Sequence, residues 1–375
     1  MPENKGFFST IWGPITAGAL IGAIAALLVY WGNPGNMGLC VACFTRDIAG
    51  SLGLHRAAPV QYLRPELPAM ALGAMLAALM SKEFRPRAGS AAIARFVLGI
   101  FAMLGALVFL GCTWRVLLRL GGGDANALLG LAGLCAGVGI SIVFLKTGYS
   151  LGRSRPAPSA VGYVAPVIAL ALVALAFWNP KFGSLDAATQ QPLGPLFSTP
   201  AEKGPGAQHA AIWISLLGGA LIGFLAQRSR FCTIGAFRNV VLTKDGHLLY
   251  AVIALVAANL VINVALGKFK WGFEGQPIAH TAHLWNFLSM TLAGLAFALG
   301  GGCPGRQVVL AGEGDSDAGV FVAGMLTGAA FSHNFALASS TKGPSEFGPA
   351  AVIIGLIVCV IIGLVMREPR EAAAA

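Results

Sequence analysis

Long apolar stretches separated by short polar segments dominate this chain. A helix of about 20 apolar residues is long enough to cross about 30 Å of hydrocarbon. Ten such stretches occur, near residues 12–31, 66–81, 93–111, 125–145, 160–178, 209–226, 248–267, 284–302, 317–338 and 348–366. The pattern predicts an all-α, polytopic integral membrane protein with about ten transmembrane helices. The first stretch is already of spanning length, so we expect no cleavable signal peptide.

Composition and charge support this interpretation and predict an orientation. Hydrophobic residues make up 56% of the chain and charged residues 11%, whereas soluble domains carry about 25% charged residues. The net charge of +10 is concentrated in short loops at helix ends, at residues 82–87, 146–155, 227–230 and 367–370. The positive-inside rule places these loops and both termini in the cytoplasm, and segment 179–208 outside. We therefore expect an inner-membrane protein in contact with lipid and without a nucleic-acid partner.

An internal repeat divides the chain. Gly111-Cys-Thr-Trp-Arg115 recurs as Gly302-Cys-Pro-Gly-Arg306, and 10 of the 27 positions in 111–137 match 302–328. Further upstream, Gly18-Ala-Leu-Ile-Gly22 recurs as Gly219-Ala-Leu-Ile-Gly223, and these glycine pairs are typical of close helix packing. Self-similarity of this kind indicates a repeated structural unit.

The repeat predicts the domain organisation. We expect residues 12–145 and 209–338 to form two repeats, each with four spans and two re-entrant half-helices. A connecting helix at 160–178, the outside loop 179–208 and a final helix at 348–366 complete the chain. Because the connecting helix adds one span, the second repeat should be inverted relative to the first. Inverted pseudo-symmetric repeats are common in transporters, whose binding site lies near the bilayer midplane.

Four cysteines lie at predicted helix breaks, in positions that the other half duplicates: Cys40, Cys112, Cys232 and Cys303. Glycine and proline mark two of these breaks, at Gly111 and at Gly302, Pro304 and Gly305. Proline suits the first turn of a helix, so Cys303 is predicted to be an N-cap, where the helix dipole favours an anion. We expect the four cysteines to line a substrate path. Cys135 and Cys359 have no repeat partner and are assigned to packing.

Each of the four breaks is followed by an arginine, at Arg46, Arg115, Arg238 and Arg306. Asp124 and Asp315 lie nine residues after the second and fourth of these. Each aspartate could neutralise its own arginine or cap the next helix. The arginines could accordingly form structural ion pairs or set the potential of an anion path, and the two roles can coexist.

Other chemistry is poorly represented in the sequence. Cys40-Val-Ala-Cys43 has redox or metal spacing, but no second pair or histidine set accompanies it. Gly121-Gly-Gly-Asp124 lacks the lysine of a phosphate-binding loop. We therefore predict no catalytic residue, metal or cofactor. Thiols are soft, weak hydrogen-bonding groups and suit an anion that carries a sulfur or selenium atom.

The duplicated elements and the run Gly300-Gly-Gly-Cys-Pro-Gly-Arg306 resemble the YeeE/YedE family of sulfur-transport membrane proteins. The stretch 38–47 is most similar to the YedE branch of selenium transporters. The resemblance implies a transporter or channel that imports a small selenium- or sulfur-containing anion such as thiosulfate. It also implies an hourglass path through Cys40, Cys112 and Cys303, with Cys232 matched by the repeat, and a small cytoplasmic sulfur-carrier protein as partner. The alternative is a membrane thiol-redox or sulfurtransferase enzyme that uses Cys40 and Cys43.

Overall fold

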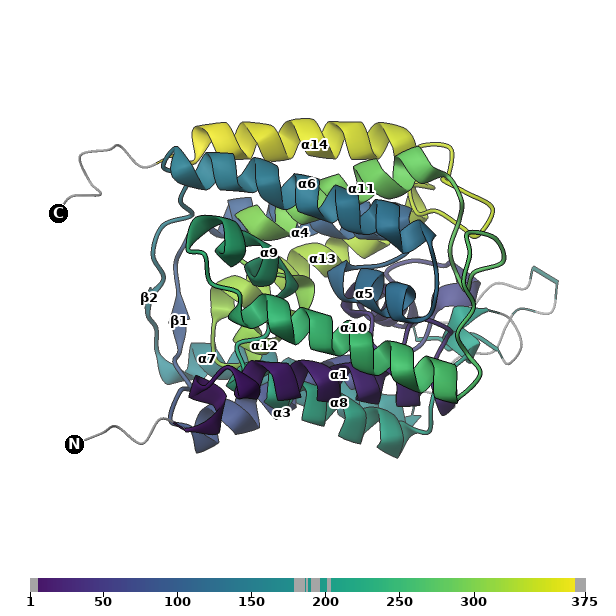
Figure 1. Ribbon diagram of the computed structural model, residues 1–375, viewed down its shortest axis with the longest axis horizontal. Helices are drawn as coiled ribbons and strands as arrows, with labels where there is room; N and C mark the ends of the chain where they lie inside the picture. Colours follow the sequence, from purple (N-terminus) through teal and green to yellow (C-terminus); the bar gives the residue numbers. More distant parts are fainter. Residues whose placement is uncertain (1–5, 179–185, 187, 190–195, 201–203, 368–375) are drawn as a thin grey trace.

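The computed structural model describes residues 6–178, 186, 188–189, 196–200 and 204–367. In this part of the chain the fold is all-α, as predicted (Figure 1). The helices are α1 (Trp12–Tyr30), α2 (Val41–Ser51), α3 (Glu66–Met80), α4 (Ala92–Phe109), α5 (Thr113–Gly121), α6 (Asn126–Lys146), α7 (Ser159–Trp178), α8 (Ile212–Arg228), α9 (Thr233–Leu242), α10 (His247–Ala265), α11 (His283–Leu299), α12 (Pro304–Gly312), α13 (Ser316–Asn334) and α14 (Gly348–Val365). Short 3-10 helices occupy η1 (Phe7–Ser9), η2 (Ala58–Val60) and η4 (Pro205–Ala207), and β1 (Arg87–Ala88) pairs antiparallel with β2 (Arg155–Pro156).

Each of the ten apolar stretches contains a helix, with boundaries a few residues from those expected. Within the described residues, eight helical segments are long and apolar enough to cross a membrane. Helix α3 has only 15 residues, and α13 carries polar residues such as Asp317. The protein is thus a multi-pass membrane protein, and the count of ten spans stays a prediction.

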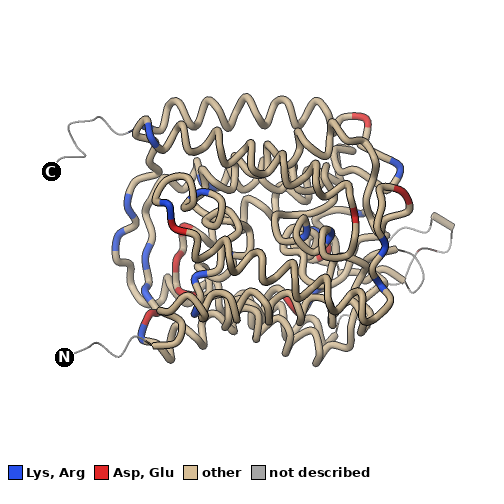
Figure 2. The backbone as a smooth tube through the Cα atoms, viewed as in Figure 1, with Lys and Arg blue, Asp and Glu red and all other residues tan. Residues whose placement is uncertain are grey.

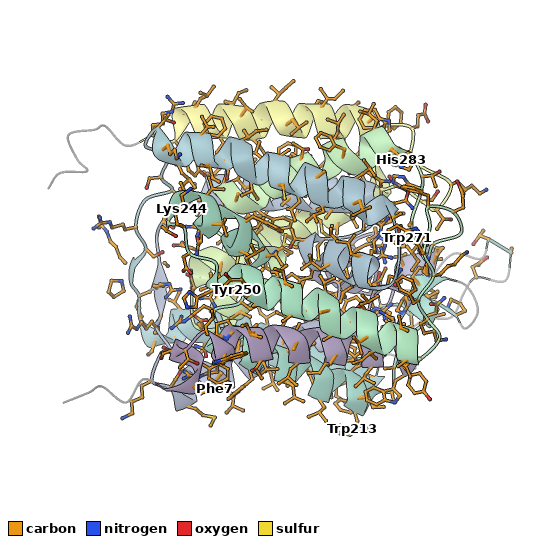
Figure 3. All side chains as sticks on the ribbon, in the orientation of Figure 1. Phe7, Trp213, Lys244, Tyr250, Trp271 and His283 are labelled. Atoms are coloured by element: carbon orange, nitrogen blue, oxygen red, sulfur yellow. The ribbon has the colours of Figure 1, made fainter. Side chains whose placement is uncertain are left out.

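The outer surface of the helix bundle is apolar. Large side chains such as Ile168, Trp213 and Ile357 are exposed on α7, α8 and α14. Figure 3 shows Trp213 pointing away from the bundle. Exposed aliphatic and aromatic side chains around a helix bundle are typical of a surface that contacts lipid.

Equivalent glycines make equivalent contacts in the two halves. A Cβ atom on Gly22 would overlap the carbonyl of Leu255 on α10, and one on Gly223 would overlap the carbonyl of Met70 on α3. Close packing therefore requires glycine at both positions, as expected for these small-residue pairs. Figure 1 shows the pair α1 and α10, and α3 beside α8, on the same side of the bundle.

The same relation holds for the second half of each repeat. Gly137 on α6 packs against the carbonyl of Thr291 on α11, and Gly328 on α13 packs against the backbone of Ile100 on α4. We interpret these matched pairs of helices as the structural counterpart of the sequence repeat.

The direction of two equivalent helices bears on the inversion. Near the start of α4, Arg95 donates to the carbonyl of Gly300 at the end of α11, at 3.2 Å. Near the end of α4, Gly105 lies against Ser289 in the first half of α11. Helices α4 and α11 therefore run antiparallel, which is what our interpretation of an inverted repeat requires.

The basic loops gather at one end of the bundle. The ends of the described chain, Gly6 and Arg367, lie at this end together with β1 and β2 (Figure 1). Figure 2 shows lysines and arginines along the same end, and further ones at the opposite end. The described parts of segment 179–208 lie at the opposite end, where Phe197 donates to the carbonyl of Ser51 at 3.0 Å. Lys5 and much of that segment lie outside the described residues.

Candidate functional site

Four short helices begin in the interior of the protein, and each begins directly after a cysteine. Cys40, Cys112, Cys232 and Cys303 are the N-cap residues of α2, α5, α9 and α12. In three of them the sulfur accepts a hydrogen bond from the backbone N–H three residues later, at 3.2 to 3.4 Å. The first turn of a helix presents unpaired N–H groups and the positive end of the helix dipole. All four sulfurs therefore lie where a negative charge is favoured.

The chain breaks before these helices through specific backbone geometry. Leu110 ends α4 in the left-handed region at φ 65°, and Gly301 follows α11 at φ 93°. The next residues, Gly111 and Gly302, are crowded by the side chain of the arginine four positions later. Pro304 then begins α12, where its missing N–H costs no hydrogen bond. The predicted break residues thus stand at the two breaks.

The four N-caps meet in pairs. The sulfur atoms of Cys40 and Cys112 are 3.7 Å apart, which joins α2 to α5. The backbone N–H of Cys303 donates to the sulfur of Cys232 at 3.4 Å, which joins α9 to α12. We call Cys40 with Cys112 the outer thiol pair, and Cys232 with Cys303 the inner thiol pair. Each pair combines the two breaks of one repeat.

Residues of α5 connect the two pairs. The indole N–H of Trp114 donates to the sulfur of Cys303 at 3.4 Å, and the indole ring lies where a side chain on Gly305 would have to go. The hydroxyls of Thr113 and Thr233 are 2.7 Å apart. The predicted path cysteines therefore belong to one continuous buried cluster.

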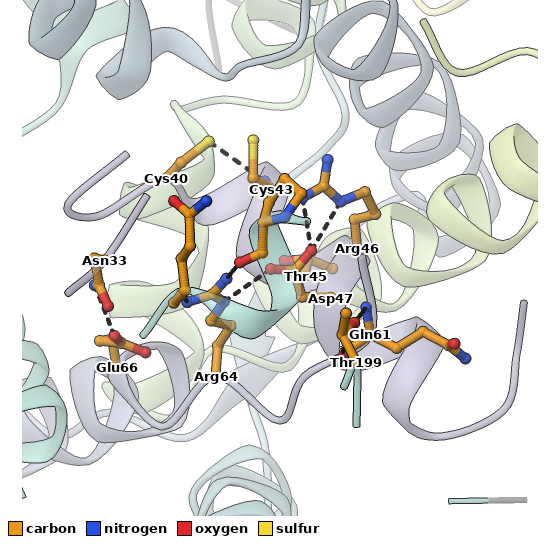
Figure 4. Close-up of polar contacts among 12 residues, drawn as sticks. Asn33, Cys40, Cys43, Thr45, Arg46, Asp47, Gln61, Arg64, Glu66 and Thr199 are labelled. Atoms are coloured by element: carbon orange, nitrogen blue, oxygen red, sulfur yellow. Dashed lines mark hydrogen bonds and ion pairs between the residues drawn. The ribbon is translucent and has the colours of Figure 1, made fainter. Parts of the chain in front are cut away.

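The other cysteines behave differently from one another. Cys43 is a buried cysteine with a free thiol, and its backbone N–H donates to the sulfur of Cys40 (Figure 4). Cys359 is buried, in keeping with packing, but Cys135 is exposed on the outer face of α6. The assignment of Cys135 to packing is therefore wrong, because the face of α6 that packs against α11 is the one carrying Gly133 and Gly137.

Of the two alternatives for Asp124, pairing with Arg115 is not observed, and its carboxylate accepts instead from the backbone N–H of Asn126 at the start of α6, at 2.9 Å. Asp124 also accepts from Arg119 at 2.6 Å, and both side chains are fully buried. The turn after α5 folds Asp124 back onto the last turn of that helix, so it cannot reach Arg115 one turn earlier. Arg115 is also fully buried. Its guanidinium donates to four backbone carbonyls, those of Asn36, Leu110, Pro277 and Ile278.

Of the two alternatives for Asp315, pairing with Arg306 is likewise not observed. Arg306 pairs with Glu313 at 3.0 Å, seven residues later on the same face of α12. Asp315 instead caps α13, where it accepts from Ala318, and pairs with Arg87 at 2.7 Å. Capping of the next helix was the alternative for this aspartate, and it is the one observed.

The remaining two arginines pair with their sequence neighbours. Arg46 donates to Asp47 at 2.7 Å, and Arg238 donates to the side chain of Asn239 at 3.4 Å. Asp47 also accepts from Arg64 at 2.8 Å, a buried residue that the sequence analysis missed (Figure 4).

Arg64 ties the loop before α3 to the segment that precedes α8. Its guanidinium donates to the carbonyls of Pro205 and Gln208 at 2.7 and 2.9 Å. These partners are more than 140 residues away, so nothing near Arg64 in the sequence indicates them. Arg119 was also missed, although its position four residues after Arg115 indicates the same helix face.

A chain of ion pairs leads from Arg306 to the basic end of the bundle. Glu313 lies 3.8 Å from Arg230, and Arg230 pairs with Glu83 at 2.8 Å. Partial burial opposes ionisation of Glu83. A hydrogen bond from Gln227 and the charge of Arg230 outweigh it and hold the pKa of Glu83 below its ordinary value.

Within the part of the chain that the structure describes, no cluster of three or more His, Cys, Asp or Glu residues could hold a metal.

Comparison with known proteins confirms the sulfur-transport resemblance. Residues 228–372, which include Cys232 and Cys303, match the Sulphur transport family. The thiosulfate transporter TsuA of Escherichia coli is 32% identical over 103 residues, which cover 26% of this chain and 28% of that protein. The thiosulfate transporter TsuA of Spirochaeta thermophila is 32% identical over 103 residues, 28% of this chain and 31% of that protein. The alignments thus span less than a third of the length of these relatives.

Proposed function

We propose that this chain, which matches the Sulphur transport family over residues 228–372, is a membrane transporter or channel that imports a small sulfur- or selenium-containing anion. The observation that carries the proposal is the meeting of four cysteine-capped half-helices in the protein interior. The anion would pass from the outer thiol pair to the inner thiol pair.

The physical support lies in the half-helix N-termini. Discontinuous helices that aim their N-terminal ends at a central site favour anions without placing a lysine or arginine directly in the path. Neutral thiols add soft contacts that do not repel a negative charge. Such a site suits an ion with a terminal sulfur or selenium atom better than chloride or phosphate.

Thiosulfate is our first choice of substrate, because the two relatives are named thiosulfate transporters. Its selenium analogue, in which selenium replaces the terminal sulfur, would present the same charge and a softer end. We also propose that the basic end of the bundle faces the cytoplasm of an inner membrane, by the positive-inside rule. A small cytoplasmic sulfur-carrier protein at that end would receive the anion, as the family resemblance implies.

Serine substitution tests the path. We expect Cys40→Ser, Cys112→Ser and Cys303→Ser each to abolish uptake of labelled thiosulfate while expression is retained. Serine is a good N-cap residue, so these variants keep the helix start and lose only the soft atom. Cys135→Ala and Cys359→Ala are the controls and should transport near the wild-type rate. Uptake at the wild-type rate by all three serine variants would refute the proposal.

The enzyme alternative is tested by Cys43. A thiol-redox or sulfurtransferase enzyme that uses the Cys40 and Cys43 pair would lose activity in Cys43→Ser. A conduit should continue to transport in this variant, because Cys43 lies inside α2 and not at its N-cap.

A further inference from the structure

Two threonine hydroxyls lie between the outer and inner thiol pairs. Thr113 follows Cys112 at the first position of α5, and Thr233 follows Cys232 at the first position of α9. Both side chains are fully buried, and their oxygen atoms are 2.7 Å apart. This hydrogen bond joins a half-helix of the outer pair to a half-helix of the inner pair.

The threonines belong to a closed ring of polar contacts. Thr233 also hydrogen-bonds the thiol of Cys303. Cys303 accepts from the indole of Trp114, which neighbours Thr113 on α5. The ring therefore crosses from α5 to α9, then to the N-cap of α12 and back to α5.

The repeat equivalents of the two threonines are apolar. The repeat places Val41 at the position equivalent to Thr233 and Pro304 at the position equivalent to Thr113. Neither residue has a polar side chain. The two threonines thus give this junction hydroxyl groups that their repeat equivalents lack.

We propose that Thr113 and Thr233 form the selectivity gate between the thiol pairs and hydrogen-bond the oxygen atoms of the passing anion. This inference rests on the proposed function and narrows its substrate class. The thiols contact the soft terminal atom of the anion. The two hydroxyls separate as the anion passes and bind the oxygen atoms at its other end. The path therefore selects an oxyanion with a terminal sulfur or selenium atom over hydrosulfide or hydroselenide, which have no oxygen.

Valine and serine substitutions test the gate. Thr113→Val and Thr233→Val keep the branched shape and remove the hydroxyl. We expect each to lower thiosulfate uptake by about tenfold, the effect of one lost hydrogen bond, and to lower hydrosulfide uptake much less. Thr113→Ser and Thr233→Ser keep the hydroxyl and should retain most uptake. Thr45→Val is the matched control, because Thr45 bonds the carbonyl of its own helix.

Cross-linking provides a second measurement if the valine variants fold poorly. The double variant Thr113→Cys/Thr233→Cys places two thiols where the hydroxyls meet. Oxidation should block its thiosulfate uptake and a reductant should restore it, with the wild type treated in parallel to account for the native cysteines.

The outcomes separate the gate from the path. Valine variants that transport thiosulfate at the wild-type rate, or an oxidised double variant that transports as well as the oxidised wild type, would overturn the gate. If the serine variants of the path cysteines still lose uptake in that case, the proposed function stands without the gate.

Discussion

The charge of Arg115 should govern how strongly the outer thiol pair attracts its anion. Arg306, the repeat equivalent, is neutralised by Glu313 at 3.0 Å. The position equivalent to Glu313 is Gly122, where a Cβ atom would overlap the side-chain oxygen of Asn36. Among the described residues no carboxylate pairs with Arg115. Its guanidinium N–H groups donate to backbone carbonyls instead. Within the part of the chain that the structure describes, Arg115 is therefore a buried cation without a carboxylate partner.

The magnitude follows from the position of Arg115 on α5. It lies three residues after Cys112, about one helical turn or 5 Å along the axis. At roughly 8 Å and an effective dielectric constant of about 20, its charge attracts a single negative charge by about 2 kcal/mol. We therefore expect Arg115→Gln to weaken apparent thiosulfate affinity by about 30-fold.

The assay is the concentration dependence of thiosulfate uptake in proteoliposomes, with protein amount checked by size-exclusion chromatography. Arg115→Lys keeps the charge but not the planar set of donors, and it should retain most of the affinity. The double variant Arg306→Gln/Glu313→Gln removes a neutral pair and should stay within about threefold of the wild type. Equal defects in Arg115→Lys and Arg115→Gln would show that anchoring, not charge, is what Arg115 contributes. A double variant as defective as Arg115→Gln would refute the asymmetry.

Three further predictions concern stability, each measured by thermal unfolding in detergent. Asp124→Asn leaves the buried Arg119 without its carboxylate and should lower the free energy of unfolding by about 3–5 kcal/mol. The double replacement Arg119→Met/Asp124→Leu should restore most of that loss. An Asp124→Asn protein as stable as the wild type would contradict this. Gly137→Ala should destabilise by roughly 1–3 kcal/mol because its Cβ overlaps a carbonyl of α11, whereas Gly139→Ala on the same helix meets nothing within 4 Å and should be harmless; equal effects would exclude backbone packing as the cause. Because the pKa of Glu83 is lowered in the fold, its stabilising contribution is present above the unfolded-state pKa and is lost as pH falls through the folded-state pKa. The wild type should thus melt above Glu83→Gln at pH 7, and a difference that persists in strong acid would disprove the linkage.

Local chemistry explains which parts of the fold could be predicted. The ten helices follow from apolar runs of spanning length, and the N-cap position of Cys303 follows from the glycines and proline beside it. Both features depend on residues within one or two turns of each other. The sequence left the partners of Arg115 and Arg306 open, because a spacing of nine residues does not reveal how the chain turns between an arginine and its aspartate. Glu313 and Arg119 lie on the same helix faces as Arg306 and Arg115, and only that periodicity could have indicated them.

The sequence by itself determined an all-α membrane protein, its duplicated breaks and the residue type at each break. Tertiary structure alone decided that the breaks meet. Cys40 reaches Cys112 across 72 residues and Thr113 reaches Thr233 across 120, through contacts between different half-helices. The physical reason is that capping and helix length are set by neighbours along the chain. The approach of two helix ends is set instead by how glycine faces on other helices pack, as at Gly22 and Gly137.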